Sequence, residues 1–174
     1  AQADDSIILA GAVSTNSIST TVGLNSGVVQ ITNIGASALT ADVKNGSLTY
    51  ISTGATTLNQ VTGGTGSVTI TAPSVNDHAS DTIADITADT VSITGTSGIG
   101  NSAPLDIASA TGITLIATSG NIDVDHVADA STTVSNVQTG SGTVTFDQTG
   151  NQALEVTIAS TTDGTITFNN TGGS

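Results

Sequence analysis

Three short segments in the C-terminal half of the chain share one pattern: Asn121-Ile122-Asp123-Val124, Thr143-Val144-Thr145-Phe146 and Thr165-Ile166-Thr167-Phe168. In each segment apolar and polar residues alternate, and Gly, Asn and Ser residues lie between the segments. A period of two, interrupted by turn-forming residues, is typical of short β-strands. Equivalent residues of the three segments lie 22 positions apart, which indicates a structural repeat of that length.

The same interval recurs elsewhere in the chain. It defines three further apolar columns, one with a single slip of one residue: Val91, Ile113, Val134 and Val156; Ile93, Leu115 and Val137; Ile83, Leu105 and Val127. A common interval is expected when each turn of a parallel β-solenoid places equivalent residues above one another. We therefore predict an all-β fold, a right-handed parallel β-helix with coils of about 22 residues. An antiparallel β-sandwich or jelly roll is the alternative.

The length of 174 residues fits a single domain, and we predict one β-solenoid segment over residues 1–174. The first part of the chain, about residues 1–45, is less regular. Val29, Leu48 and Val68 are more closely spaced than the 22-residue interval, which indicates shorter coils, a cap or a joining strand. The apolar run Ile7-Ile8-Leu9 is the candidate for such a joining strand.

The composition excludes several classes of protein. One Lys+Arg against 14 Asp+Glu gives a net charge of −13, so the chain has no basic surface for nucleic acid. No apolar run approaches the roughly 18–20 residues of a membrane-spanning helix. The absence of cysteine excludes disulfides and thiolate metal sites. The opening Ala1-Gln2-Ala3 is similar to the end of a signal-peptidase site, and we predict a secreted, extracellular location.

No catalytic motif is present in the sequence, and we predict that the protein is not an enzyme and uses no organic cofactor. A β-helical polysaccharide lyase or hydrolase is an alternative, because two carboxylates suffice for glycoside hydrolysis. Such enzymes usually line their clefts with aromatic and basic residues, which are rare here. The two histidines, His78 and His126, are expected at exposed corners.

Calcium is the candidate inorganic ligand. Asp123, Asp125 and Asp129 lie near one predicted corner, and the 22-residue interval places Asp125 beside Asp147. Stacked carboxylates repel one another, and a hard cation with oxygen ligands would relieve that repulsion. A second acidic stretch contains four residues: Asp77, Asp81, Asp85 and Asp89. The alternative is that all of these are solvated charges that keep the protein soluble.

Outward Thr-x-Thr pairs suggest a further alternative, an ice-binding face. The pairs are Thr69/Thr71, Thr143/Thr145 and Thr165/Thr167. The 22-residue interval aligns the second of these pairs with Asn121 and Asp123, which would interrupt a uniform threonine array. Threonine also suits any outward β-position by propensity.

Four motifs resemble the degenerate repeats of filamentous-haemagglutinin-type adhesins and related giant bacterial surface β-helix proteins: Gly98-Ile99-Gly100, Pro104-Leu105-Asp106-Ile107, Ile113-Thr114-Leu115 and Gly120-Asn121-Ile122. The resemblance covers about residues 83–172. It implies secretion, an extended shape and adhesive or surface-structural work, and it implies no catalytic residue.

These observations together predict a structural or adhesive segment of an extracellular bacterial surface filament. A solenoid ends in rows of unpaired backbone groups, and the last apolar pair, Ile166 and Phe168, carries no polar cap. We therefore expect self-association end to end by β-strand stacking. A host surface or a glycan is the expected external partner.

Overall fold

The computed structural model describes residues 7–13, 17–21, 27–78 and 83–173. These residues form strands, turns and bends and no helix, so none of them forms a long apolar helix able to cross a membrane. The strands are β1 Ile7–Val13, β2 Ser17–Thr21, β3 Val28–Asn33, β4 Ser37–Asp42, β5 Ser47–Ser52, β6 Thr56–Ala72, β7 Val75–Asp77, β8 Ile86–Gly95, β9 Leu105–Ala108, β10 Gly112–Ala117, β11 Ile122–Val127, β12 Thr132–Thr139, β13 Val144–Thr149, β14 Leu154–Val156, β15 Ala159–Thr161 and β16 Ile166–Asn170.

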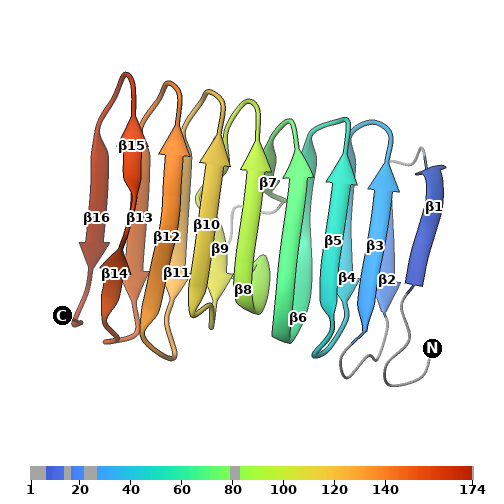
Figure 1. The fold of residues 1–174 in the computed structure, drawn as a ribbon, viewed down its shortest axis with the longest axis horizontal. Helices are drawn as coiled ribbons and strands as arrows, with labels where there is room; N and C mark the ends of the chain where they lie inside the picture. Colours follow the sequence, from blue (N-terminus) through green and yellow to red (C-terminus); the bar gives the residue numbers. More distant parts are fainter. Residues whose placement is uncertain (1–6, 14–16, 22–26, 79–82, 174) are drawn as a thin grey trace.

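The strands wind into a flattened β-solenoid with two facing layers (Figure 1). The front sheet contains β1, β3, β5, the second half of β6, the second half of β8, β10, β12, β14 and β15. The back sheet contains the remaining strands and the first halves of β6 and β8. The chain rises along the front sheet, descends along the back sheet and advances from right to left, which is a right-handed winding.

Every strand pair is parallel, which confirms the predicted β-solenoid and excludes the antiparallel sandwich. Val144 pairs with Ile122 below and Ile166 above, and Phe146 pairs with Val124 and Phe168. The columns that begin at Val91 and Ile93 are also confirmed, with the one-residue slip at β12 absorbed by a register shift. Side chains of one column therefore stack about 4.8 Å apart.

The irregular N-terminal spacing reflects shorter coils. Val29, Leu48 and Val68 are register partners in the front sheet, so their close spacing in the sequence is the length of the coils that join them. β1 pairs with β3 of the same chain, so this predicted joining strand forms the first layer of the front sheet.

One predicted column is wrong. Leu105 pairs with Val124 and not with Val127, because the coil between the paired positions is shorter than the predicted repeat. Ile83 and Val127, the other predicted members, are 63% and 53% exposed. The regular interval fails here because the corner from β8 to β9 spans residues 96–104, whereas the equivalent corner from β10 to β11 spans only residues 118–121, so β9 begins late in its coil.

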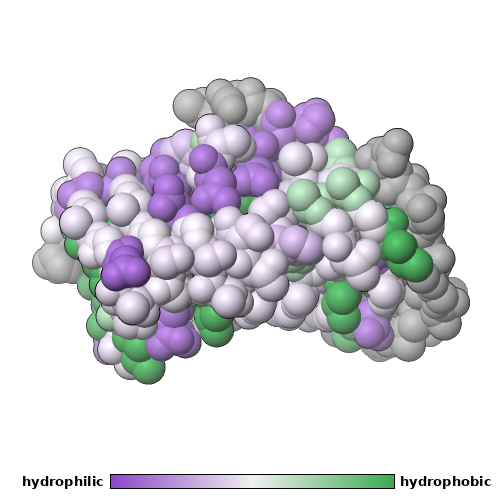
Figure 2. Space-filling view, turned by 90° about the horizontal axis from the view of Figure 1, so that it is seen from above, coloured by the Kyte–Doolittle hydropathy of each residue, from purple (hydrophilic) through white to green (hydrophobic). Residues whose placement is uncertain are grey.

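Outward positions differ between the two sheets. Figure 2 looks down on the coil corners and shows strongly hydrophilic residues gathered toward the back-sheet side. The front-sheet side is mostly of intermediate hydropathy in the same view. This difference arises because the outward aspartates of β9, β11 and β13 all lie on the back sheet.

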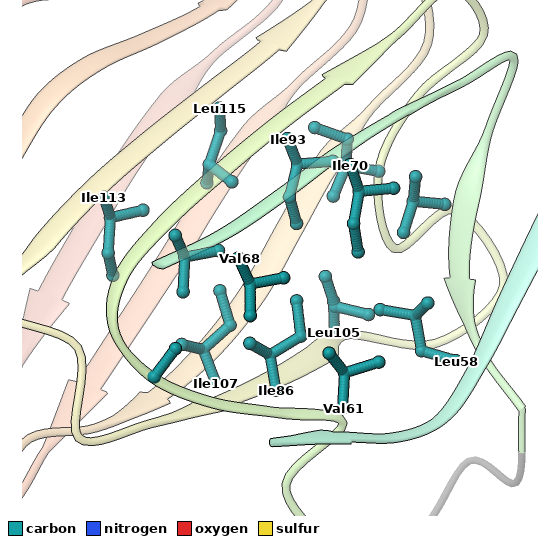
Figure 3. Close-up of a cluster of buried hydrophobic side chains, with 14 of the residues drawn as sticks. Leu58, Val61, Val68, Ile70, Ile86, Ile93, Leu105, Ile107, Ile113 and Leu115 are labelled. Carbon is teal, nitrogen blue, oxygen red and sulfur yellow. The ribbon is translucent and has the colours of Figure 1, made fainter. Parts of the chain in front are cut away.

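The core lies between the sheets and consists mainly of Val, Ile and Leu, with several Ala. Figure 3 shows front-sheet residues facing back-sheet residues across the interior: Val68, Ile70, Ile93, Ile113 and Leu115 face Leu58, Val61, Ile86, Leu105 and Ile107. All of these side chains are at most 1% exposed. Burial of such a side chain contributes roughly 1.5–3 kcal/mol, so repetition of the column supplies the stability of the fold.

The corners stack as closely as the strands. Gly142 has a φ of 118°, in the left-handed region that favours glycine. A Cβ atom at this position would lie 2.5 Å from the carbonyl oxygen of Gly120, the equivalent corner one coil below. Backbone packed directly on backbone therefore excludes a side chain here.

A pair of glycine variants tests this stacking. Gly142→Ala should lower the free energy of unfolding by more than Gly35→Ala. Gly35 has a φ of 99° but no atom within 4 Å of its added Cβ, so that variant reports backbone strain of about 1–2 kcal/mol alone. Urea denaturation followed by circular dichroism gives both values. Equal losses for the two variants would contradict close coil contact at Gly142.

Candidate functional site

A column of oxygen-bearing side chains runs along the outer face of the back sheet. Asp125 is the register partner of Asp106 in β9 and of Asp147 in β13, and Asp147 is the partner of Asn169 in β16. Asn169 Nδ2 donates a hydrogen bond to Asp147 Oδ1. Successive members of the column are one strand spacing apart, about 4.8 Å. The fold thus holds three carboxyl groups in a row.

This arrangement disfavours the charged forms of the carboxyl groups. Partial burial raises the pKa of Asp125, and the Asp147 carboxylate raises it further. Partial burial likewise raises the pKa of Asp123, two residues earlier on β11, with added repulsion from Asp125 and Asp147. The neighbouring side chains therefore interact as one electrostatic group.

A more deeply buried carboxyl trio extends the column at its N-terminal end. Oxygen atoms of Asp77, Asp85 and Asp106 all lie within 4.8 Å of one another. Asp85 donates its backbone N–H to the Asp106 carbonyl at 2.8 Å, and the Asp106 N–H donates to Asp85 Oδ2 at 3.0 Å. Asp77 is 8% exposed and Asp85 is 2% exposed. We call Asp77, Asp85, Asp106, Asp123, Asp125 and Asp147 together the acidic face.

Burial dominates the titration of Asp85. The pKa of Asp85 is raised to about 8. Desolvation is the largest cause, and the neighbouring carboxyl groups of Asp77 and Asp106 also raise it. The backbone N–H of Asp106 acts in the opposite direction but does not outweigh burial. A carboxyl group with this pKa is largely protonated at neutral pH and hydrogen-bonds to Asp77 as an acid.

An open groove of about 610 Å³ lies along the acidic column. Asp106, Asp125, Asp147 and Asn169 line it together with residues at the ends of β11 and β13. Its walls carry carboxyl and amide oxygens, which are ligands for hard cations such as Ca²⁺. Its lining residues include neither Lys nor Arg.

The structure brings together three of the four predicted calcium ligands. Asp123, Asp125 and Asp147 share the acidic face. Asp129 lies beyond the end of β11, is exposed and accepts a hydrogen bond from Ser109 Oγ. Calcium binding itself stays a prediction.

The second acidic stretch is divided by the fold. Asp77 and Asp85 join the buried trio, whereas Asp89 accepts a hydrogen bond from Thr111 Oγ1 at 2.7 Å, and Asp81 lies outside the described residues. Sequence reasoning missed Asp106 as a member of the site. Asp106 precedes Asp125 by one short coil, so only a search that allowed coils of different lengths could have found it.

The expectation of exposed histidines holds for His78 and is wrong for His126. His126 is 1% exposed and points into the core between the sheets. Its Nδ1 lies 3.2 Å from Gln148 Oε1, whereas Gln148 Nε2 donates to Gln152 O and Asn170 Oδ1, so we assign the proton to Nδ1. Burial lowers the pKa of His126 and keeps it neutral.

No family model, no curated protein and no solved structure matches this chain. The strands form a β-solenoid, and the resemblance to haemagglutinin-type repeats stays a prediction.

The raised pKa of Asp85 gives a testable dependence of stability on pH. A carboxyl group whose pKa is raised from 3.8 to about 8 by folding stabilises the protonated native state, and this contribution declines as pH rises through that interval. Melting temperature should therefore fall between about pH 4 and about pH 8, and Asp85→Asn should reduce the slope. Asp163→Asn, at an exposed position, is the matched control. A slope unchanged by Asp85→Asn would contradict the assignment.

Calcium should raise the melting temperature at about pH 9, where the acidic face is most highly charged. A shift that appears at about 1 mM CaCl₂, but not at equal ionic strength of NaCl, would indicate a specific site. Two variants then locate the binding site. Asp125→Asn removes one carboxylate from the predicted calcium site, and Asp85→Asn removes one from the buried trio. Calcium binding at the acidic face would be contradicted if calcium did not shift the melting temperature of the native chain, or if both variants kept the full shift.

Proposed function

We propose that this chain is a structural or adhesive segment of an extracellular bacterial surface filament, and that its solenoids join end to end by β-strand stacking. The proposal includes secretion and an external partner such as a host surface or a glycan. The open edge formed by the last described coil carries the argument.

The edge consists of β14, β15 and β16, each of which pairs with strands on one side only. Val144, in the coil below, is fully buried, whereas its column partner Ile166 is 38% exposed. One further coil, of a continuing polypeptide or of another copy, would bury Ile166 as the coils below bury Val144 and Ile122.

Backbone groups at this edge are oriented for the same pairing. The N–H of Ile122 donates to Thr143 O in the next coil, and the N–H of Val144 donates to Thr165 O. Ile166 occupies the equivalent position one coil later, so its N–H points toward the open side. A parallel strand placed there would continue both the ladder and the apolar columns.

Electron microscopy of negatively stained protein tests the assembly. The native chain should form rods whose length increases with protein concentration, and Ile166→Pro should prevent elongation. Proline removes the outward N–H and is tolerated at the first residue of an edge strand, which Ile166 is in β16. Ile166→Val keeps the N–H and is the matched control, so it should still elongate.

Two results would overturn the proposal. One is a native chain that remains monomeric by analytical ultracentrifugation at all accessible concentrations. The other is a set of rods that Ile166→Pro leaves unchanged, since the C-terminal edge would then take no part in the contact.

A further inference from the structure

We propose that the outer face of the front sheet is a second association surface, on which the front sheet of another copy of this chain packs face to face. This lateral contact is distinct from end-to-end stacking and uses none of the edge strands. The distribution of charge is the first observation that supports it.

Among the described strands the outward carboxyl groups lie mainly on the back sheet, and Glu155 of β14 is exposed at the end of the front sheet. The outward residues of the front sheet from β3 to β12 include no Asp, Glu, Lys or Arg. The outward aspartates of the acidic face lie on the back sheet, where Asp125 is the register partner of both Asp106 and Asp147. Two molecules of net charge −13 repel most strongly when their back sheets meet, and least when their front sheets meet.

The side chains of the front face suit contact with a surface like itself. One outward column is formed by Thr49, Thr69, Ser92 and Thr114, and the adjacent one by Ile51, Thr71, Thr94 and Ile116. These residues present hydroxyl and methyl groups at strand spacing, and Ile51 is 38% exposed. The face from β3 to β12 has no outward aromatic ring to stack on a sugar, which favours a protein sheet over a glycan as its occupant.

The area of the face sets the expected strength of the contact. Strands β3, β5, β6, β8, β10 and β12, about 4.8 Å apart and about five residues long, give roughly 500 Å² per copy. A pair would bury about 1,000 Å² in total, near the lower limit for a specific interface. The dimer of isolated chains is therefore weak, and repetition along a filament would strengthen it.

Symmetry then identifies the residues that meet. Like surfaces pair about a two-fold axis, so residues near the centre of the face contact the same region of the other copy. The central strands of the series from β3 to β12 are β6 and β8, and Ser92 and Thr69 are register partners there. End-to-end stacking would instead separate equivalent residues by the whole height of the front sheet, roughly 35–40 Å.

Cross-linking through a single introduced cysteine tests the contact, because the chain has no cysteine of its own. Ser92→Cys, treated with a short bismaleimide, should give a covalent dimer. Thr145→Cys, which lies half-buried on the acidic face, is the matched control and should remain monomeric. Thr71→Cys provides a second front-face position if Ser92→Cys alters folding.

A charge variant distinguishes a specific contact from random collision. Adding Thr69→Asp to Ser92→Cys should reduce the cross-linking rate by about tenfold or more, because the change brings like charges together across the contact. Adding Thr145→Asp, which changes the net charge equally, should have little effect. Equal cross-linking of the front and back cysteines, or a rate insensitive to Thr69→Asp, would overturn the lateral contact. Neither result depends on end-to-end filaments.

Discussion

Parallel pairing of each coil with its equivalent in the next is the interaction on which this structure depends. It brings Val144 into contact with Ile122 and Ile166, and it repeats that contact along every column of the core. Each inward side chain must therefore fit its own counterparts above and below, as well as the facing sheet. This explains a core made of Val, Ile and Leu with few larger side chains, of which Tyr50 is hydrogen-bonded to Ser37 through its hydroxyl. The protein is stabilised by repetition of small contacts and not by one large central cluster.

The same pairing imposes a cost on polar residues. Like stacks on like, so an aspartate at one outward position acquires carboxylate neighbours wherever the column repeats it. The column of Asp106, Asp125 and Asp147 is the result, and burial together with repulsion from Asp147 raises the pKa of Asp125. Inward polar residues are accommodated differently: His126 Nδ1 pairs with Gln148 Oε1, and Gln148 Nε2 donates to Asn170 Oδ1, so the three side chains form a ladder across three coils. Both features follow from one geometric rule applied to different side chains.

Two kinds of surface follow from this architecture, and they support different kinds of association. The solenoid edge offers backbone groups and column ends, which pair with any chain that continues the ladder. The walls offer side chains only, and here the two sheets differ, because most of the outward carboxyl groups lie on the back sheet and the outward residues of the front sheet are uncharged from β3 to β12. A filament built from such units would be more acidic on one side than on the other. That asymmetry would direct lateral contacts to one face and leave the other in solvent.

The amino-acid sequence by itself determined the parallel β-solenoid, the columns through Ile122 and Val91, and the stacking of Asp125 on Asp147, because each depends on a local period of two and on a regular spacing of equivalent residues. Only the tertiary structure decided the pairing of Leu105 with Val124, the burial of His126 and the meeting of Asp77, Asp85 and Asp106. The physical reason is the variable length of the corners. A corner that becomes longer or shorter preserves the backbone ladder but changes which residues face one another, and packing against the neighbouring coils decides which residues belong to the corner and which to the strand.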